Sequence, residues 1–378
     1  MYCLGIETSC DETAAAVVED GREIRSSVVA SQLDLHAEYG GVVPELACRK
    51  HIQVVDRIVE RSLRESGVTL DEIGLVSVVQ GPGLIGALLI GVNFARGLAW
   101  GRGLPLMPVN HVESHVYACA MSNPNMEFPA IGLVASGGHT SLFVMEGLGK
   151  YRRLGETTDD AVGESFDKVA SLLGLPYMGG PQVEKLALKG DRDAIPFPRG
   201  LSKKKNYNFS YSGLKTAVLY HVRGFRRVRE GGSRSPRPRF QTPSSPACLS
   251  GSGSEAASEE TVSRDAGWRK LSERERADVA ASFQEAALDI LVKKSLRAAA
   301  EFGAKSIAVG GGVAANQRLR DLFLAGAETL AVPVYFPKKE LCTDNAGMVA
   351  GLGYWLYKTD PSAATYDFDA KANMDFFR

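Results

Sequence analysis

Residues 2–19 read YCLGIETSCDETAAAVVE, and residues 131–146 read IGLVASGGHTSLFVME. Each stretch consists of an apolar strand, a polar turn and a second apolar strand. Further along each half, at residues 75–99 and 306–326, an apolar strand runs into a glycine-rich turn and then into a helix. This repeat predicts two similar α/β halves with a cleft between them, which is a natural place for a nucleotide-like ligand.

The composition is that of an ordinary globular protein. The chain has 378 residues, 44 basic and 44 acidic side chains, and 44% hydrophobic residues, which excludes a coiled coil, a collagen-like chain and a wholly disordered protein. The apolar runs are too short to cross a membrane, and the N-terminus lacks the basic and apolar regions of a signal peptide. Six scattered cysteines without a CxxC pair favour neither a disulfide framework nor a zinc ribbon. We therefore expect a cytoplasmic protein without a membrane partner.

One segment differs in composition from the rest of the chain. Residues 225–268 are rich in Ser, Gly, Pro and Arg, poor in apolar side chains, and carry seven arginines against five acidic residues. Such a stretch buries too little surface to offset its ordering entropy, so we predict a disordered insertion. Outside it, apolar periodicity or length predicts helices at residues 44–65, 85–100, 161–173, 271–302, 313–325 and 343–357.

Two histidines, His111 and His115, are four residues apart in the sequence NHVESH at residues 110–115. In a helix, both imidazoles lie on one face and can reach the same metal ion. Glu113 does not directly follow the first histidine, so this is not the HExxH motif of metallopeptidases. A surface helix without a metal is the alternative, and a third ligand would decide between the two. Asp344 is the candidate, although its position also suits a helix N-cap; two histidines and one carboxylate suit iron(II) or zinc.

Glycine turns and acidic residues are further candidates for a binding site. SGGHT at residues 136–140 lies between two strands, where glycines let a ligand approach the backbone, although a plain hairpin turn gives the same pattern. GGGVAAN at residues 310–316 precedes a helix, and we interpret its three glycines as a nucleotide contact rather than a packing requirement. Asp11 and Glu12 lie in a turn between strands, where they hold a metal, orient a nucleophile or stay solvated. Asp167 either accepts hydrogen bonds from a ribose, an adenine or an amine, or is an ordinary surface residue of a helix.

Nine motifs in a fixed order carry a resemblance to a known family. The chain resembles the tRNA N6-adenosine threonylcarbamoyltransferases, once called O-sialoglycoprotein endopeptidases. Its SGGHT motif and its overall pattern resemble the bacterial branch of that family. The resemblance runs from residue 4 to about residue 355, except for the insertion. The motifs are ETSCDET (7–13), GGVVPELACRKH (40–51), GPGLIGALLIG (81–91), NHVESH (110–115), SGGHT (136–140), GESFDKVASLLGL (163–175), NFSYSGLKTA (208–217), GGGVAAN (310–316) and CTDNAGM (342–348).

This resemblance implies a fold and a reaction. The fold is α/β of the actin/Hsp70-like (ASKHA) type, with two domains, duplicated halves and the active site in the cleft between them. The first half is expected at residues 1–107, and the second half, with the metal and nucleotide site, at residues 108–342. A C-terminal helix at about 343–378 is expected to pack back on the first half. The implied reaction transfers the threonylcarbamoyl group from L-threonylcarbamoyl-adenylate to N6 of adenosine 37 in tRNAs that read ANN codons, and it releases AMP.

The resemblance also implies roles for single residues. His111, His115 and Asp344 match the metal ligands, which implies one divalent ion per subunit, Fe(II) or alternatively Zn(II). Asp11 and Glu12 match an acidic pair near the active site, and one of them is our candidate for the catalytic base. The residues that match those holding the adenylate are Val134, Ala135, Ser136, Gly137, Gly138, Asp167, Gly180, Glu184 and Asn316.

The implied partners are tRNA at its anticodon loop, the threonylcarbamoyl-adenylate, an inactive paralogue subunit and a small P-loop ATPase subunit. Two small departures from the family pattern, Cys48 for Ser and Ser114 for Gly, should be tolerated, and Lys215 in SGLKTA matches a position to which we assign no role. Three rival functions stay open. A non-enzymatic scaffold, like the inactive paralogues of the pathway, should lack the two histidines and Asp344, which this chain keeps. An ATP-dependent small-molecule kinase of the same fold would use Mg²⁺, which prefers oxygen ligands to histidines. A metallopeptidase is weakened by the missing HExxH.

Overall fold

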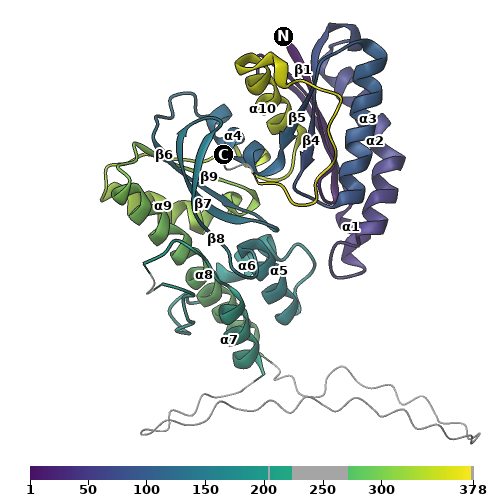
Figure 1. Cartoon of the computed structure of the whole chain (residues 1–378). Coiled ribbons are helices and arrows are strands. Elements are labelled where there is room, and N and C mark those ends of the chain that lie inside the picture. Colours follow the sequence, from purple (N-terminus) through teal and green to yellow (C-terminus); the bar gives the residue numbers. More distant parts are fainter. Residues whose placement is uncertain (203–204, 224–270, 376–378) are drawn as a thin grey trace, which may run out of the picture.

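The computed structural model of the chain describes residues 1–202, 205–223 and 271–375, so the segment at 225–268, predicted to be an insertion, lies outside the described residues. The hairpin at residues 2–19 belongs to the first of two five-stranded sheets, whose order is β3-β2-β1-β4-β5 (Figure 1). The pairs β3–β2 and β2–β1 are antiparallel, whereas β1–β4 and β4–β5 are parallel. These strands are β1 (Tyr2–Glu7), β2 (Glu12–Glu19), β3 (Glu23–Ser31), β4 (Ile73–Gly81) and β5 (Leu106–Asn110).

The second sheet repeats the topology of the first. Its order is β10-β9-β6-β7-β8, with the pairs β6–β7 and β7–β8 antiparallel and the pairs β6–β9 and β9–β10 parallel. The strand at residues 130–135 therefore corresponds to β1, and the predicted duplication of two α/β halves is confirmed. These strands are β6 (Ala130–Ala135), β7 (Thr140–Gly147), β8 (Lys150–Glu156), β9 (Ser306–Gly310) and β10 (Val334–Tyr335).

Helices cover both faces of each sheet, as parallel strands require. α2 and α3 pack on one face of the first sheet and α10 on the other, while α4 and α8 pack on opposite faces of the second sheet (Figure 1). In the described part of the chain, no helix is long and apolar enough to cross a membrane. The helices are α1 (Leu33–Ala37), α2 (Pro44–Ser66), α3 (Ile85–Arg102), α4 (His111–Ser122), α5 (Val162–Leu172), α6 (Gly179–Ala187), α7 (Ser212–Val222), α8 (Glu273–Glu301), α9 (Gln317–Glu328) and α10 (Ala346–Thr359), with short 3-10 helices at Leu70–Glu72, Gly312–Ala315, Lys339–Leu341 and Pro361–Ala363.

α4 and α10 pack against each other between the two sheets. α4 follows β5 of the first sheet in sequence but packs on the second sheet, while α10 follows the second sheet and packs on β1, β2 and β4 of the first. Gly5 of β1 permits the close approach of α10, because a Cβ there would lie 2.3 Å from the carbonyl oxygen of Ala346 and 2.7 Å from the amide nitrogen of Ala350. These two helices therefore connect the halves of the molecule.

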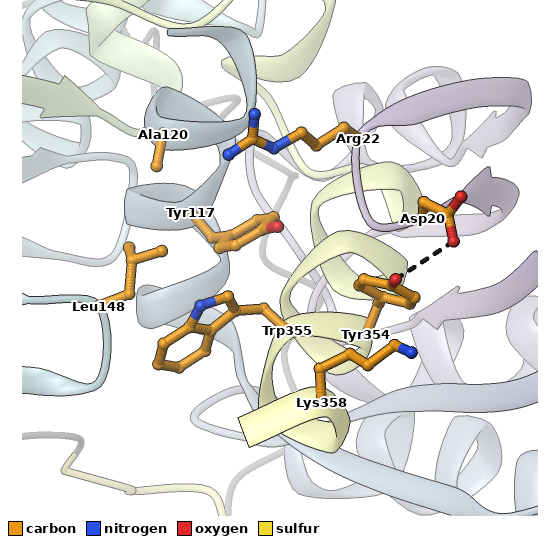
Figure 2. Close-up of a pocket in the computed structure, with 8 residues that line it drawn as sticks. All are labelled: Asp20, Arg22, Tyr117, Ala120, Leu148, Tyr354, Trp355 and Lys358. Atoms are coloured by element: carbon orange, nitrogen blue, oxygen red, sulfur yellow. Dashed lines mark hydrogen bonds between the residues drawn. The ribbon is translucent and has the colours of Figure 1, made fainter. Parts of the chain in front are cut away.

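A small cavity of 240 Å³ lies toward the C-terminal ends of these two helices (Figure 2). The β2–β3 turn of the first half and the β7–β8 turn of the second half, which are equivalent turns, both reach it. The Tyr117 hydroxyl donates a hydrogen bond to the carbonyl of Gly21 at 3.2 Å, which fixes one of these turns against α4. The residues that line the cavity are Asp20, Arg22, Tyr117, Ala120, Leu148, Tyr354, Trp355 and Lys358.

The C-terminal region differs from its prediction. A helix was expected over about 343–378, but α10 ends at Thr359. Residues 360–375 continue without an α-helix or a strand, apart from the short 3-10 helix at Pro361–Ala363. The side chain of Asp360 begins this turn by accepting a hydrogen bond from the amide of Ser362 at 3.0 Å. The helical prediction for this stretch is therefore wrong.

Candidate functional site

His111, His115 and Asp344 lie together where α4 begins and just before α10. One nitrogen of each imidazole and one carboxylate oxygen of Asp344 all lie within 4.8 Å of one another. His115 Nε2 is 3.1 Å from Asp344 Oδ1, and His111 Nε2 is 3.6 Å from the same oxygen. The two imidazole rings stand nearly perpendicular at 82°, with centroids 4.8 Å apart. The structure thus brings together the three residues that the sequence analysis proposed as metal ligands.

A helix cap sets the position of the histidines on α4. Asn110 accepts hydrogen bonds from the amides of Val112 at 2.9 Å and Glu113 at 3.1 Å through its side-chain oxygen. This N-cap fixes the start of α4 at His111 and so places His115 one turn later on the same helix face. The spacing in the sequence is therefore realised as a pair of adjacent imidazoles.

A second cap frees Asp344 to face the histidines. The N-cap of α10 is Asn345, whose side-chain oxygen accepts a hydrogen bond from the amide of Met348 at 2.9 Å. The alternative interpretation, in which Asp344 caps this helix, is therefore wrong. Asp344 lies one residue outside the helix, and its carboxylate contacts His115 instead.

Glu7, the last residue of β1, holds His111 by its other nitrogen. Glu7 Oε2 lies 3.1 Å from His111 Nδ1, and Ser9 Oγ lies 3.2 Å from the same nitrogen. Glu7 is fully buried, and its second carboxylate oxygen accepts a hydrogen bond from the amide of Ser9 at 2.6 Å. A partner of this kind fixes the ring and leaves Nε2 directed at Asp344. Glu7 was not predicted from the sequence. Its signal was an acidic residue at the end of an apolar strand, because a buried charge needs a partner.

The charges at this site shift the pKa values of its histidines. Burial lowers the pKa of His111, but the negative charges of Asp344 and Glu7 outweigh it and raise this pKa to about 9. Burial raises the pKa of Asp344, but the neighbouring His111 and His115 outweigh it and hold this pKa well below its usual range. The ring of His139, 6.3 Å from that of His111, has its pKa lowered to about 4 by burial and by the nearby histidines. A cation that binds here must therefore displace a proton from His111.

The acidic pair stands at the start of β2. Asp11 and Glu12 both line the same cavity as His111 and Asp344. Burial and the charges of Asp344 and Asp11 raise the pKa of Glu12 to about 9, although the Ser31 hydroxyl donates a hydrogen bond to its carboxylate at 3.4 Å. Glu12 therefore holds a proton at neutral pH in the metal-free protein.

Residues from both halves line a cavity of 1320 Å³. Val134 and Ala135 lie inside the second sheet with no exposed surface, and they are not among the described residues that line this cavity. Four further candidates, His115, Gly180, Glu184 and Asn316, are not among the described residues that line this cavity. The candidates that do line it are Asp11, Glu12, His111, Ser136, Gly137, Gly138, Asp167 and Asp344.

The SGGHT segment forms a tight turn whose glycines face open space. The amide of Ser136 donates to the carbonyl of His139 at 2.8 Å, and the amide of His139 donates to Ser136 Oγ at 3.1 Å. A Cβ at Gly137 or at Gly138 would meet nothing within 4 Å. Packing inside the protein therefore does not require these two glycines, and a ligand in the cavity can approach their backbone closely.

The three consecutive glycines after β9 have mixed roles. A Cβ at Gly310 would lie 2.6 Å from the carbonyl oxygen of His115, and one at Gly311 would lie 2.4 Å from that of Ala135. Gly311 also has a left-handed φ of 89°. Packing thus requires two of the three glycines, contrary to the interpretation as a nucleotide contact alone, whereas Gly312 faces open space and lines the cavity.

α9 begins later than predicted. The short 3-10 helix at Gly312–Ala315 comes first, and Asn316 then caps α9 at Gln317. Glu184 of α6 accepts a hydrogen bond from the amide of Gln317 at 2.7 Å, so a carboxylate already occupies this helix N-terminus. The side-chain amide of Asn316 donates to Gln284 of α8 at 2.9 Å. These contacts bring Glu184 and Asn316 to one point, where α6 and α9 meet.

Asp167 and Gly180 meet at the start of α6. Asp167 accepts a hydrogen bond from the amide of Gly179 at 2.8 Å and another from the amide of Gly180. Asp167, which belongs to α5, therefore caps the start of α6 with its carboxylate. Asp167 also lines the cavity. Any ligand group that reaches Asp167 shares it with these two amides.

The sequence of this chain is similar to those of one family of known proteins. The sequence profile described as tRNA N6-adenosine threonylcarbamoyltransferase matches residues 23–351. The protein named tRNA N6-adenosine threonylcarbamoyltransferase from Protochlamydia amoebophila (strain UWE25) is 44% identical over 370 residues, which is 98% of this chain and 96% of the relative. The protein of the same name from Geobacter sp. (strain M21) is 46% identical over 357 residues, 94% of this chain and 92% of the relative.

The chain belongs to the tRNA N6-adenosine threonylcarbamoyltransferase family. Solved structures of other proteins share only its fold. Full-length HypF in the phosphate- and nucleotide-bound form aligns with a TM-score of 0.56 at 13% identity, over 96% of this chain and 47% of HypF. The Acidaminococcus fermentans (R)-2-hydroxyglutaryl-CoA dehydratase component A aligns with a TM-score of 0.51 at 12% identity, over 97% of this chain and 100% of that protein. The predicted actin/Hsp70-like fold is confirmed.

Asp344 Oδ1 lies at the distance from each imidazole nitrogen that a shared metal ion needs, and the three donor atoms together lie within 4.8 Å of one another. Ligands about 2.1 Å from a tetrahedral ion lie roughly 3.4 Å apart, and the two imidazole nitrogens lie 3.1 and 3.6 Å from Asp344 Oδ1. Two imidazoles and one carboxylate on one side leave coordination positions open for a substrate or water. Glu7 supplies the acidic partner that a ligating histidine usually has.

The family motif SGLKTA places Lys215 in a charged array at the cavity. Lys215 and Lys168 each lie 2.7 Å from a carboxylate oxygen of Asp160, and Lys168 also pairs with Glu164 at 2.8 Å. Asp160 thus joins α5 and α7, and both lysines line the cavity. The array holds two positive charges at one edge of the site.

Proposed function

We propose that this protein transfers the threonylcarbamoyl group from L-threonylcarbamoyl-adenylate to N6 of adenosine 37 in tRNAs that read ANN codons, with release of AMP. The observation that carries the proposal is the convergence of His111, His115 and Asp344 at a cavity that also holds the turn at 136–138 and the acidic pair at 11–12. Membership of the family supports this proposal, since relatives 44% and 46% identical over nearly the whole chain are named tRNA N6-adenosine threonylcarbamoyltransferase.

The adenylate is proposed to bind along the second half. The candidates at 134–138, Asp167, Gly180, Glu184 and Asn316 come from the β6–β7 turn and from the starts of α6 and α9. Backbone N–H groups at a glycine turn suit a phosphate. Asp167 and Glu184 already occupy the starts of α6 and α9, and a carboxylate repels a phosphate. We therefore expect the turn at 136–138 to hold the phosphate and the two acids to hold hydroxyl or amino groups of the nucleoside.

The reaction requires a base and accurate positioning. The bond from N6 to the carbamoyl carbon forms, the bond from that carbon to the phosphate oxygen breaks, AMP leaves, and N6 releases a proton. An exocyclic adenine amine is a poor nucleophile, so a correctly placed proton acceptor contributes strongly. Asp11 or Glu12 is the proposed acceptor, because both lie in the cavity with the metal-ligand candidates. Glu12 can serve only after it has lost the proton that it holds in the metal-free protein. Separate Asp11→Asn and Glu12→Gln variants distinguish them, because only loss of the acceptor removes the acidic limb of the kcat profile, where kcat falls as the acceptor becomes protonated.

One divalent ion per subunit is proposed at His111, His115 and Asp344, with Fe(II) as first choice and Zn(II) as the alternative. When bound, such an ion polarises an acyl carbonyl or stabilises the departing negative charge. Glu7 and Ser9 position the ring of His111 for this purpose. Elemental analysis of protein purified without oxygen tests the assignment, and protein that is fully active with neither metal contradicts it.

The remaining partners are proposed from the family. tRNA is the acceptor substrate, and its target adenine has to leave the anticodon-loop stack to reach the cavity. An inactive paralogue subunit and a small P-loop ATPase subunit are proposed to act with this chain in the cytoplasm. Co-purification from cell extract tests these partners, and full multiple-turnover activity of the isolated chain would argue against a need for them.

Neither the kinase nor the metallopeptidase is favoured. A kinase that uses Mg²⁺ would need oxygen ligands, whereas two of the three convergent donors are imidazole nitrogens. A metallopeptidase of the HExxH type would use an acid on the helix that carries the two histidines. The acid between them, Glu113, is buried beside Tyr151, and its charge together with burial raises the pKa of Tyr151. Glu113 is not among the described residues that line the cavity.

The decisive experiment supplies both substrates directly. The full chain is incubated with threonylcarbamoyl-adenylate and unmodified tRNA, with and without the two partner subunits, and the tRNA is digested to nucleosides. We expect threonylcarbamoyl-adenosine from the wild type and none from His111→Ala. Its absence under every partner condition would overturn the proposed function.

A further inference from the structure

The segment after α10 reaches the cavity by a fixed route. Residues 365–375, here called the C-terminal strap, cross the first half and return toward α4 as the yellow trace of Figure 1. The amide of Thr365 donates to the carbonyl of Leu106 at 2.9 Å, and the Tyr366 hydroxyl donates to that of Leu104 at 2.5 Å. Arg96 of α3 lies over the Phe368 ring, 5.2 Å from its centroid. These contacts anchor the start of the strap to the first half.

The middle of the strap is bound to the last two residues of β4. The Gln80 side-chain amide donates to the carbonyl of Asp369 at 2.9 Å, and the amide of Lys371 donates to the carbonyl of Gln80 at 2.9 Å. A Cβ at Gly81 would lie 2.1 Å from the carbonyl oxygen of Lys371, so a side chain at that position would displace the strap. The strap is therefore packed closely against the end of β4 at Gly81.

The end of the strap is fixed on both sides of Asn373. The carbonyl of Ala372 accepts a hydrogen bond from the amide of Gly83 at 3.1 Å, and the carbonyl of Met374 accepts one from the side-chain amide of Asn110 at 3.5 Å. Asn110 is the N-cap of the helix that starts with His111. Asn373 is therefore linked to the metal-ligand helix through its neighbour Met374, which contacts Asn110. Asp375 then forms an ion pair with Arg153 of β8 in the second half.

The Asn373 side chain is available to a ligand. Ala372 and Asn373 both line the large cavity, on the same wall as Pro82, Gly83 and Leu84. Asn373 is exposed, and none of the described residues hydrogen-bonds its side chain. An amide held on a backbone that is pinned on both sides presents its donor and its acceptor with little loss of entropy on binding.

We propose that Asn373 contacts the adenine base of the acceptor nucleotide and helps to select adenosine. This inference rests on the proposed function. The glycine turn and the starts of α6 and α9, which are proposed to hold the adenylate, belong to the second half, whereas the strap lines the wall of the first half. The acceptor base therefore enters beside Asn373. A side-chain amide matches adenine because it can accept from the N6 amine and donate to an adjacent ring nitrogen.

The test combines protein variants with altered tRNA. Steady-state kinetics are measured for wild type and Asn373→Ala with tRNA that carries adenosine, 7-deazaadenosine or 1-deazaadenosine at position 37. We expect Asn373→Ala to lower kcat/KM for natural tRNA by about 10- to 100-fold, the usual value of a two-bond contact to a base. One deaza analogue should lower kcat/KM for the wild type but not further for Asn373→Ala, because the two changes remove the same hydrogen bond.

Controls distinguish failure of the role proposed for Asn373 from failure of the proposed function on which it rests. Asp367→Asn, at an exposed position of the strap outside the cavity, should behave as wild type. Hydrolysis of threonylcarbamoyl-adenylate without tRNA should be unchanged in Asn373→Ala, since the donor half is intact. If wild type makes threonylcarbamoyl-adenosine but neither analogue is coupled to Asn373, the inference fails and the proposed function stands. If wild type makes no product, the proposed function fails.

Discussion

Replacing Glu7 by Gln should change how metal binding depends on pH. Glu7 is buried and touches His111 Nδ1 at 3.1 Å, and its charge is one cause of the raised His111 pKa of about 9. Glu7→Gln keeps the size of the side chain but removes the charge. Burial, which lowers the His111 pKa, is then opposed by Asp344 alone, so this pKa should fall toward its ordinary value of about 6.5.

The two consequences of this change have opposite signs at neutral pH. In the wild type, a cation displaces a proton from His111, so affinity at pH 7 should be about 100-fold weaker than above pH 9. In Glu7→Gln most of this proton competition disappears, but the loss of an acidic partner to a ligating histidine weakens metal affinity by about 10- to 100-fold. The variant should therefore bind about 10- to 100-fold more weakly than wild type at pH 9.5, but between equally well and about 10-fold more tightly at pH 7.

Competition of Co²⁺ or Zn²⁺ with a chelating dye from pH 6 to pH 9.5 measures this directly. The logarithm of the wild-type affinity should rise by about one per pH unit between 7 and 9, and that of Glu7→Gln should be nearly flat there. Ser9→Ala is the matched control, because it removes the other contact of His111 Nδ1, at 3.2 Å, without removing a charge. Equal slopes for wild type and Glu7→Gln would refute the electrostatic argument.

Four further outcomes are expected. His115→Ala and Asp344→Ala should each lose bound metal and tRNA modification while keeping the fold, as elemental analysis, nucleoside analysis and circular dichroism can check; a variant without metal and with full activity would exclude a metal role. Gly5→Ala should destabilise the protein by about 3 kcal/mol or more in urea unfolding, because its Cβ would lie 2.3 Å from a carbonyl oxygen of α10. Gly97→Ala, in a helix with nothing within 4 Å of the new Cβ, should instead stabilise it by about 0.5–1 kcal/mol. The Tm of the metal-free protein should fall as the pH rises from about 6.5 to about 9, because protonated His111 is bound more favourably in the folded state and loses its proton over this range; a Tm that rises over this range would contradict the sign.

Local patterns were sufficient to predict the duplicated halves. Each hairpin alternates or runs apolar over a strand length, and each glycine-rich turn stops a strand before a helix, so the order of elements follows from neighbours in sequence. The pair His111 and His115 was predictable for the same reason, because a four-residue spacing is one helix turn. Periodicity also predicted the last helix at 343–357, close to α10, but the course of the chain after Thr359 was not predictable, since those residues are held by contacts with strands and loops far away in sequence.

The candidate site shows where sequence reasoning ends. Nothing local to Asp344 separates a cap from a ligand, and only the contact with His115 and the cap by Asn345 decide it. Glu7 is 104 residues from His111, so its role depends on the pairing of β1 within the first sheet and on the place where α4 starts.

The sequence by itself determined the two α/β halves, the paired histidines and the family, because these rest on periodicity, short spacings and motifs read in order. Only the tertiary structure decided which acid holds His111, which glycines are needed for packing and where the strap ends. Those features depend on close contacts between segments that the chain brings together only when α4 and α10 pack between the two sheets.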